Sequence, residues 1–251
     1  MFNPYNNGPF GGNRAFGGGR RGFASNYQYQ TLPQGYVNEQ AGSLISKVMG
    51  LLAFSFLFAF VGGFLGVTFL NLTLGSYLFV AIAGLVVLIV LNFAINRPGL
   101  NLFLLYLFTF LEGLSLSPII REYVGAGLTN ILAEAFLLTA VTSLGMAAYA
   151  WTTKRDFSGL GSKLFIGILI LIAASILEIF FHSTLLYLVI AVAGVALFSA
   201  YILFYVQRAK YLADTTPNAI GLTVSLFIAV LNLFIFILEI LTILQGGNRR
   251  R

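Results

Sequence analysis

The sequence has no cysteine and a single histidine among its 251 residues, which excludes disulfide bonds, thiolate metal sites and histidine-rich metal centres. Charged residues make up 9% of the chain, whereas a soluble domain carries about 25%. Hydrophobic residues reach 59%, and 25 of the residues are phenylalanine. So few ionised groups in so apolar a chain indicate a protein that is dissolved in lipid.

Seven apolar segments follow the first forty residues, and each has the roughly 20 residues that a helix needs to cross the hydrocarbon core. None alternates as a membrane β-strand does, and a backbone in lipid must satisfy its hydrogen bonds internally. The sequence therefore predicts an all-α integral membrane protein with seven transmembrane helices, at residues 44–70, 74–96, 100–120, 128–151, 162–182, 184–208 and 218–244.

Residues 1–40 are rich in glycine and carry Arg14, Arg20 and Arg21. They contain too little apolar surface to build a core and lack the apolar stretch of a signal peptide. The run 17–22 is similar to RGG-type RNA-binding segments, but we favour a flexible cytoplasmic tail and expect no nucleic-acid partner. The predicted organisation is a disordered tail over 1–40, a membrane domain over 41–245 and a basic tail over 246–251.

The distribution of lysine and arginine predicts the orientation, because cytoplasmic loops carry an excess of both. With the N-terminus inside and seven full spans, ten basic residues lie inside and four outside. The arginine triplet at 249–251 is the exception, and a re-entrant segment would move it inside; the long last segment favours seven full spans. We expect a multi-pass protein of a bacterial inner membrane. The inside set is Arg14, Arg20, Arg21, Lys47, Arg97, Lys154, Arg155, Lys163, Arg208 and Lys210.

Ionisable groups within apolar segments are costly and are candidates for function. Glu112 belongs to a stripe with Thr109 and Ser115, three residues apart, and Pro118 is expected to free a backbone carbonyl and kink the helix. In the last segment, polar residues recur every seven positions. They are Ser225, Asn232 and Glu239.

Two further carboxylates, Glu134 and Glu178, lie in the fourth and fifth segments. In the predicted orientation, they and the glutamates at 112 and 239 fall in the outer half of the membrane. We interpret the four, with Asn232, as candidates for an acidic outer cavity that attracts cations. The alternative is that each carboxyl is protonated, bonds to a neighbouring helix or extends to the headgroups.

Other motifs are few. Gly62 and Gly66 have the spacing of a close helix contact. The sequence has no phosphate-binding loop, zinc-protease motif or nucleophile elbow, so we expect no enzyme activity, no metal site and no cofactor. Neither an internal repeat nor paired broken helices occur, which makes a small-molecule transporter the least favoured class.

Five runs, in this order and spacing, resemble the signatures of the Bax inhibitor-1/YccA family. The first, from Tyr106 to Pro118, carries Glu-Gly-Leu-Ser-Leu-Ser-Pro, and the third, from Thr153 to Gly159, reads Thr-Lys-Arg-Asp-Phe-Ser-Gly. The other runs are 134–140, 194–201 and 232–234. The resemblance covers the membrane domain and leaves out the tail at 1–40.

The resemblance implies a last helix that is central between two layers of three helices. It also implies a pH-sensitive calcium leak, suppression of cell death, or association with a membrane-bound AAA protease. Calcium or protons and that protease are thus possible partners beside the lipid bilayer. In leak members, two aspartates pair near the cytosolic side; this chain has Tyr205 and Ala229 at those positions. The proton-sensing contact that this aspartate pair forms in the leak members therefore cannot be assigned to this chain.

Two functions remain open. One is a cation or calcium leak, which the glutamates favour and the lost aspartate pair opposes. The other is a non-conducting regulator that binds a membrane protease or another membrane complex during stress, for which a flexible tail is suited.

Overall fold

The computed structural model describes residues 37–70 and 74–246, in which seven helices and no strand occur. All seven are long and apolar enough to cross a membrane. This confirms the predicted all-α architecture. The helices are α1 (Val37–Thr68), α2 (Leu74–Ala94), α3 (Leu100–Gly125), α4 (Thr129–Thr152), α5 (Leu160–Phe181), α6 (Thr184–Ala209) and α7 (Thr216–Gly246).

Two helix boundaries differ from the prediction by more than two residues. α1 begins four residues inside the expected tail, the rest of which lies outside the described residues, as does the expected tail beyond Gly246. α3 continues five residues past the predicted end at 120. Arg121 directly follows the predicted end, and its guanidinium donates to the carbonyls of Gly66 (2.9 Å) and Leu70 (2.6 Å) at the end of α1. The cation thus caps α1 without interrupting α3.

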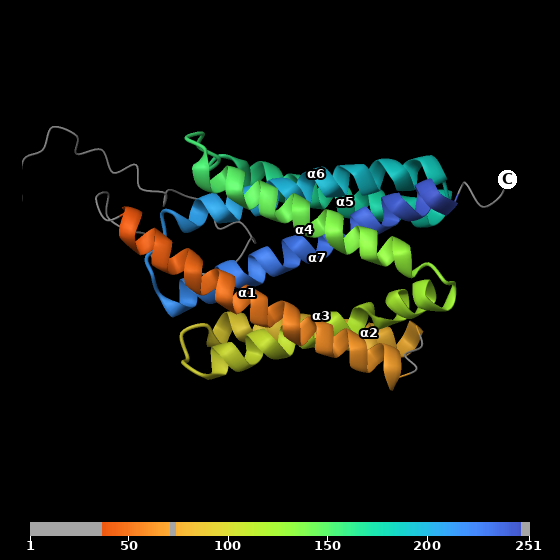
Figure 1. Cartoon of the computed structure of the whole chain (residues 1–251), viewed down its shortest axis with the longest axis horizontal. Coiled ribbons are helices and arrows are strands. Elements are labelled where there is room, and N and C mark those ends of the chain that lie inside the picture. Colours follow the sequence, from red (N-terminus) through yellow and green to blue (C-terminus); the bar gives the residue numbers. More distant parts are fainter. Residues whose placement is uncertain (1–36, 71–73, 247–251) are drawn as a thin grey trace, which may run out of the picture.

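The last helix is central, as predicted. α7 runs between a layer formed by α1, α2 and α3 and a layer formed by α4, α5 and α6 (Figure 1). It packs against α1 and α3 on one side and against α4 and α6 on the other, whereas α2 and α5 lie at the outside. A helix in this position needs two buried apolar faces. Leu222 and Leu233 of α7 belong to one buried cluster, and Ile220 and Phe227 to a second.

The two ends of the bundle differ in charge. The α2–α3, α4–α5 and α6–α7 connections lie where α1 begins, and the α3–α4 and α5–α6 connections lie where α7 ends (Figure 1). We call the first the basic end and the second the acidic end. The described residues of the basic end include Lys47, Arg97, Lys154, Arg155, Lys163, Arg208 and Lys210, beside Glu39, Asp156 and Asp214. Those of the acidic end include Glu122, Glu134, Glu178 and Glu239, beside Arg121.

Pro118 lies inside α3 without ending it. Proline has no N–H, so the carbonyl of Leu114, four residues earlier, loses its helical donor. The Ser117 hydroxyl donates to that carbonyl at 2.7 Å, and both atoms are buried. The predicted free carbonyl is therefore satisfied by the neighbouring side chain.

Glycines allow α1 and α3 to approach closely, which confirms the contact predicted from the Gly62 and Gly66 spacing. A Cβ atom at Gly62 would collide with the backbone oxygen of Phe110, and one at Gly66 with Ser117. On the opposite helix, a Cβ atom at Gly113 would collide with the backbone of Ala59. Because backbone atoms cannot rotate away, these glycines set the distance between the two helices.

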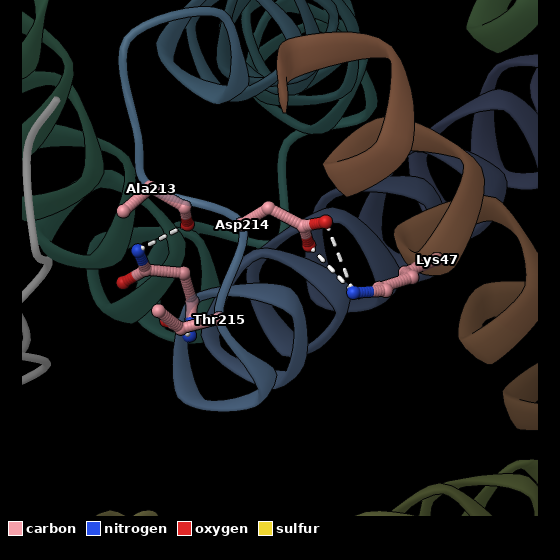
Figure 2. Close-up of polar contacts among 5 residues, drawn as sticks. Lys47, Ala213, Asp214 and Thr215 are labelled. Carbon is pink, nitrogen blue, oxygen red and sulfur yellow. Dashed lines mark hydrogen bonds and ion pairs between the residues drawn. The ribbon is translucent and has the colours of Figure 1, made fainter. Parts of the chain in front are cut away.

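An ion pair joins α1 to the α6–α7 connection at the basic end. Lys47 Nζ lies 2.9 Å and 3.0 Å from the two carboxylate oxygens of Asp214 (Figure 2). Partial burial raises the pKa of Asp214, but hydrogen bonds from Ser43 and Lys47 outweigh it and hold the pKa below its usual range. The carboxylate therefore stays ionised, and the contact weakens only as the pH falls through that lowered pKa.

We expect Gly113→Ala to destabilise the protein by about 1–3 kcal/mol, because the added methyl group must displace the α1 backbone. Thermal unfolding in detergent measures the change. Gly145→Ala is the matched control, since a Cβ atom there meets no atom within 4 Å. Equal melting temperatures for the two variants would contradict the close contact.

Candidate functional site

A cavity of about 280 Å³ opens at the acidic end, between the ends of α3 and α7 and the start of α6. Its wall is largely aliphatic and aromatic, with Ile119, Phe234 and Leu238 among the lining residues. Polar groups also line it, and these are Glu122, Tyr123, Tyr187, Glu239 and Thr242. The site therefore presents two carboxylates and three hydroxyls on an apolar wall.

The two carboxylates occupy different depths. Glu122 is exposed, in the last turn of α3, whereas Glu239 is partly buried, two turns before the end of α7. The Glu239 Oε2 atom is buried and has no hydrogen-bond partner. The carboxylate also interacts with the Tyr187 hydroxyl of α6. A buried carboxylate oxygen without a partner is costly in hydrocarbon, so Glu239 is the strongest candidate for a ligand-binding group.

The other two members of the seven-residue repeat donate to carbonyls of their own helix. Ser225 Oγ donates to the Gly221 carbonyl at 2.9 Å, and Asn232 Nδ2 donates to the Ile228 carbonyl at 2.8 Å. Asn232 does not line the cavity. The seven-residue repeat thus has one member, Glu239, that reaches the site.

Hydrogen bonds tie the end of α7 to both layers around the cavity. The hydroxyls of Tyr123 and Thr242 lie 2.5 Å apart and join α3 to α7. Gln245 Nε2 donates to Glu134 at 2.7 Å and joins α7 to α4. Glu134, one of the predicted candidates, is therefore an exposed interhelical contact and does not line the cavity.

Glu178 is near the site without lining it. It lies close to the end of α5, and its charge acts on Glu239. Glu178 thus influences Glu239 electrostatically, whereas Glu122 lines the cavity with it.

Glu112 is separate from this group. α3 runs on to Gly125, so Glu112 falls at the midpoint of the helix and not in its outer half. Its Oε1 atom faces α2, where a Cβ atom at Gly84 would lie 3.2 Å away. Thr109 and Ser115 donate to carbonyls of their own helix, those of Tyr106 and Glu112. The predicted polar stripe therefore does not converge on the cavity.

Tyr205 and Ala229, at which the family resemblance implies aspartates, lie in the half of the bundle nearer the basic end. Ala229 is 2% exposed, and the Tyr205 hydroxyl forms a hydrogen bond with Ser225 of α7. The Tyr205 ring stacks on Tyr201, with 5.7 Å between the ring centroids. Here α6 and α7 meet through an uncharged hydrogen bond and apolar packing.

Sequence reasoning missed four residues of the site: Glu122, Tyr123, Tyr187 and Thr242. The first two follow the predicted end of the third segment and were assigned to a loop. Thr242 lies three residues after Glu239, a spacing that places both on one helix face and could have identified it. Tyr187 is uncharged and lies near the start of the sixth apolar segment, where no spacing pattern marks it.

In the described part of the chain, no three His, Cys, Asp or Glu residues lie close enough together to hold a metal ion. A divalent cation in the cavity would meet two carboxylates and would keep part of its own hydration shell. Calcium tolerates such mixed oxygen coordination.

Seven apolar helices around a central α7, with a polar cavity at one end, define a multi-pass α-helical membrane protein. The family model "Inhibitor of apoptosis-promoting Bax1" matches residues 41–246. The chain therefore belongs to the Bax inhibitor-1/YccA family, as the sequence motifs predicted.

Relatives occur in bacteria and in animals. The chain is 33% identical to an uncharacterised protein of Helicobacter pylori strain J99 over 208 residues, which is 82% of this chain and 89% of the relative. It is 32% identical to the modulator of FtsH protease YccA of Escherichia coli strain K12, covering 58% of this chain and 65% of that protein. It is also 33% identical to protein lifeguard 4 of Mus musculus, covering 57% and 58%.

We expect Tyr187→Phe and Glu239→Gln to be energetically coupled, because the phenol is the polar neighbour of the carboxylate. Removing the hydroxyl should cost about 1–3 kcal/mol in the native background and much less in the Glu239→Gln background. A double-mutant cycle on detergent unfolding measures the difference. Strict additivity of the two variants would show that the contact contributes nothing.

Proposed function

We propose that this protein binds cations at the acidic end and takes part in cation homeostasis, with calcium or protons as the ions and without enzymatic activity. The observation that carries the proposal is the buried, unpartnered Oε2 atom of Glu239, which lies on a cavity that also holds Glu122. The four acidic-end glutamates would concentrate cations at the entrance of the cavity.

The arrangement of the two carboxylates supports entry from the solvent. A cation first meets exposed Glu122 and then the buried oxygen of Glu239, where fewer water molecules screen its charge. Tyr187 and the Tyr123–Thr242 pair supply neutral oxygens for an ion that has lost part of its hydration. The two carboxylates of the cavity would repel anions.

The orientation that we propose places the N-terminus in the cytoplasm. Seven of the eight basic residues in the described ranges lie at the basic end, and Arg121 is the eighth. Cytoplasmic ends carry such an excess. The cavity would then face the outside of a bacterial inner membrane.

Passage across the membrane would require α6 and α7 to separate in the half nearer the basic end. There the Tyr205–Ser225 hydrogen bond and buried Ala229 close the contact. Neither group carries a charge near neutral pH, so gating would depend on the outer glutamates and not on an aspartate pair.

We expect Glu239→Gln to slow calcium entry into liposomes that contain the purified protein by about tenfold, equivalent to 1.4 kcal/mol of lost ion binding. Glutamine keeps the shape of the side chain and removes its charge. A calcium-sensitive dye inside the vesicles reports the rate. We expect Glu122→Gln to have a smaller effect, because that carboxylate is exposed.

Two variants serve as matched controls. Glu112→Gln removes a carboxylate that faces α2, and Glu134→Gln removes one that bonds to Gln245. Glu112→Gln should retain the parent rate, and Glu134→Gln should lower it only slightly, because it removes one charge from the acidic end but no group that lines the cavity. The proposal fails if Glu239→Gln conducts like the parent, or if Glu112→Gln is equally slow.

A second candidate function is regulation of a membrane-bound AAA protease. The observations that favour it are the relative named as a modulator of FtsH protease and the closed α6–α7 contact at Tyr205. A protein of this kind would not need to conduct. The Gly/Arg-rich residues that precede α1 would supply a segment for the protease to engage.

We expect removal of residues 1–36 to abolish binding to a purified bacterial membrane-bound AAA protease in reconstituted vesicles, while α1 remains intact. Co-purification and the rate of substrate degradation are the measurements. The Glu239→Gln variant is the control and should bind like the parent. Absence of binding by the full chain would reject this function, and full binding by the truncated chain would reject the role of the tail.

A further inference from the structure

A charged surface lies at the basic end, away from the cavity, where α4 ends, α5 begins and α6 ends. Lys154 and Arg155, in the α4–α5 connection, are exposed, as is Lys163 in the first turn of α5. These three form no ion pair with any residue in the described ranges. We call these residues, together with Arg208 and Lys210 at the end of α6, the basic patch.

The α4–α5 connection is fixed against α6. Gln207 bonds to it on both sides, accepting from the Phe157 N–H at 2.5 Å and donating to the Arg155 carbonyl. Lys210 Nζ donates to the Trp151 carbonyl at 2.5 Å. Lys154 and Arg155 are thus presented from a backbone whose position is set by α6.

One carboxylate lies in the same connection. Asp156 accepts from the Ser158 N–H at 2.8 Å and from the Ser158 hydroxyl at 3.0 Å. Its oxygens are therefore directed into a local turn. The net charge of the patch remains strongly positive.

α5 and α6 approach closely beside these cations. A Cβ atom at Gly161 would lie 3.2 Å from the ring of Phe204, and the Arg208 guanidinium carbon lies 5.8 Å from the centre of the same ring. Arg208 is therefore near the first turn of α5, which carries Lys163. Cations from the α4–α5 connection, α5 and α6 thus share one surface.

This surface borders on groups that belong at the level of lipid headgroups. Trp151 is 39% exposed, and Lys210 Nζ lies 5.5 Å from the centre of its ring. Tryptophan is enriched where headgroups meet hydrocarbon. Further along α5 from Lys163, Ile166 and Ile170 are exposed apolar side chains. The basic patch is therefore adjacent to an exposed apolar face of α5, against which acyl chains can pack.

We propose that the basic patch binds the phosphate headgroup of an anionic phospholipid, whose acyl chains lie on the exposed face of α5. The cations match the phosphate, and the neighbouring isoleucines match the chains. A soluble polyanion would use the charge but leave the adjacent apolar face unused. The site holds α4, α5 and α6 together from outside the bundle.

The single tryptophan of the chain provides the test, because Trp151 lies at the patch. Phosphatidylglycerol with brominated acyl chains, titrated into protein in phosphatidylcholine vesicles, should quench its fluorescence at several-fold lower mole fraction than brominated phosphatidylcholine. Removing one cation should reduce this preference by about fivefold at low salt. The Lys154→Gln, Arg155→Gln, Lys163→Gln triple variant should show no preference.

The matched control is Arg97→Gln, which removes one exposed arginine at the same end but from the α2–α3 connection. The Arg97→Gln variant should keep the parent's preference for quenching by brominated phosphatidylglycerol, whereas Arg155→Gln should have a reduced preference. Equal quenching by the two lipids in the parent would overturn the proposal. So would equal losses in Arg97→Gln and Arg155→Gln, which would indicate the general field of the basic end. Unchanged melting temperatures establish that the variants fold.

Discussion

Hydrocarbon offers no hydrogen-bond partner, and this constraint shapes every polar group in the bundle. Ser225 and Asn232 of α7 donate to carbonyls of their own helix, and Ser117 covers the carbonyl that Pro118 leaves free. Arg121 is retained at the membrane boundary because the end of α1 offers it carbonyls. Three described side chains, Ser55, Ser143 and Glu239, depart from this pattern with a buried oxygen that has no hydrogen-bond partner, and of these only Glu239 lines the cavity. An exception of this kind, on the central helix and beside a cavity, is where a ligand can lower the free energy most.

The separation of charge between the two ends gives the molecule a direction. Glutamates gather where Glu239 lies, and lysines and arginines gather at the opposite end, where an ion pair, Lys47–Asp214, joins α1 to the connection before α7. The acidic end would raise the local concentration of cations, and the basic end would be held against anionic headgroups. Both proposals therefore use one asymmetry, but they involve different residues and different helices.

Helix number, approximate bounds and the central position of α7 followed from apolar length and from the family motifs. The glycine contact between α1 and α3 also followed, because Gly62 and Gly66 are about one turn apart and leave a strip of bare backbone that another helix can approach. The cavity did not. A heptad or triplet stripe tells which residues share a helix face, but not which neighbour that face meets. Glu112 and Glu239 therefore looked equivalent in the sequence, although one faces α2 and the other a cavity. Glu122 was missed because the third apolar segment was predicted to end at residue 120. α3 in fact continues to Gly125, since the end of α1 provides hydrogen-bond acceptors for Arg121.

If Tyr205 and Ala229 occupy the positions of the aspartates that the family resemblance implies, the opening of this protein would differ from that of the leak members. Two facing carboxyls repel when ionised and attract when they share a proton, so such a pair can switch with pH. Tyr205 and Ser225 form a neutral contact across α6 and α7, and Ala229 leaves the second position apolar. A neutral contact responds to separation of the helices but not to protons in the physiological range. A pH-dependent switch would then have to act on α7 from elsewhere, and the carboxylates near its far end are the candidates that we propose. Because α7 contacts both layers, a cation bound at Glu239 would act on the one helix whose displacement reaches them all.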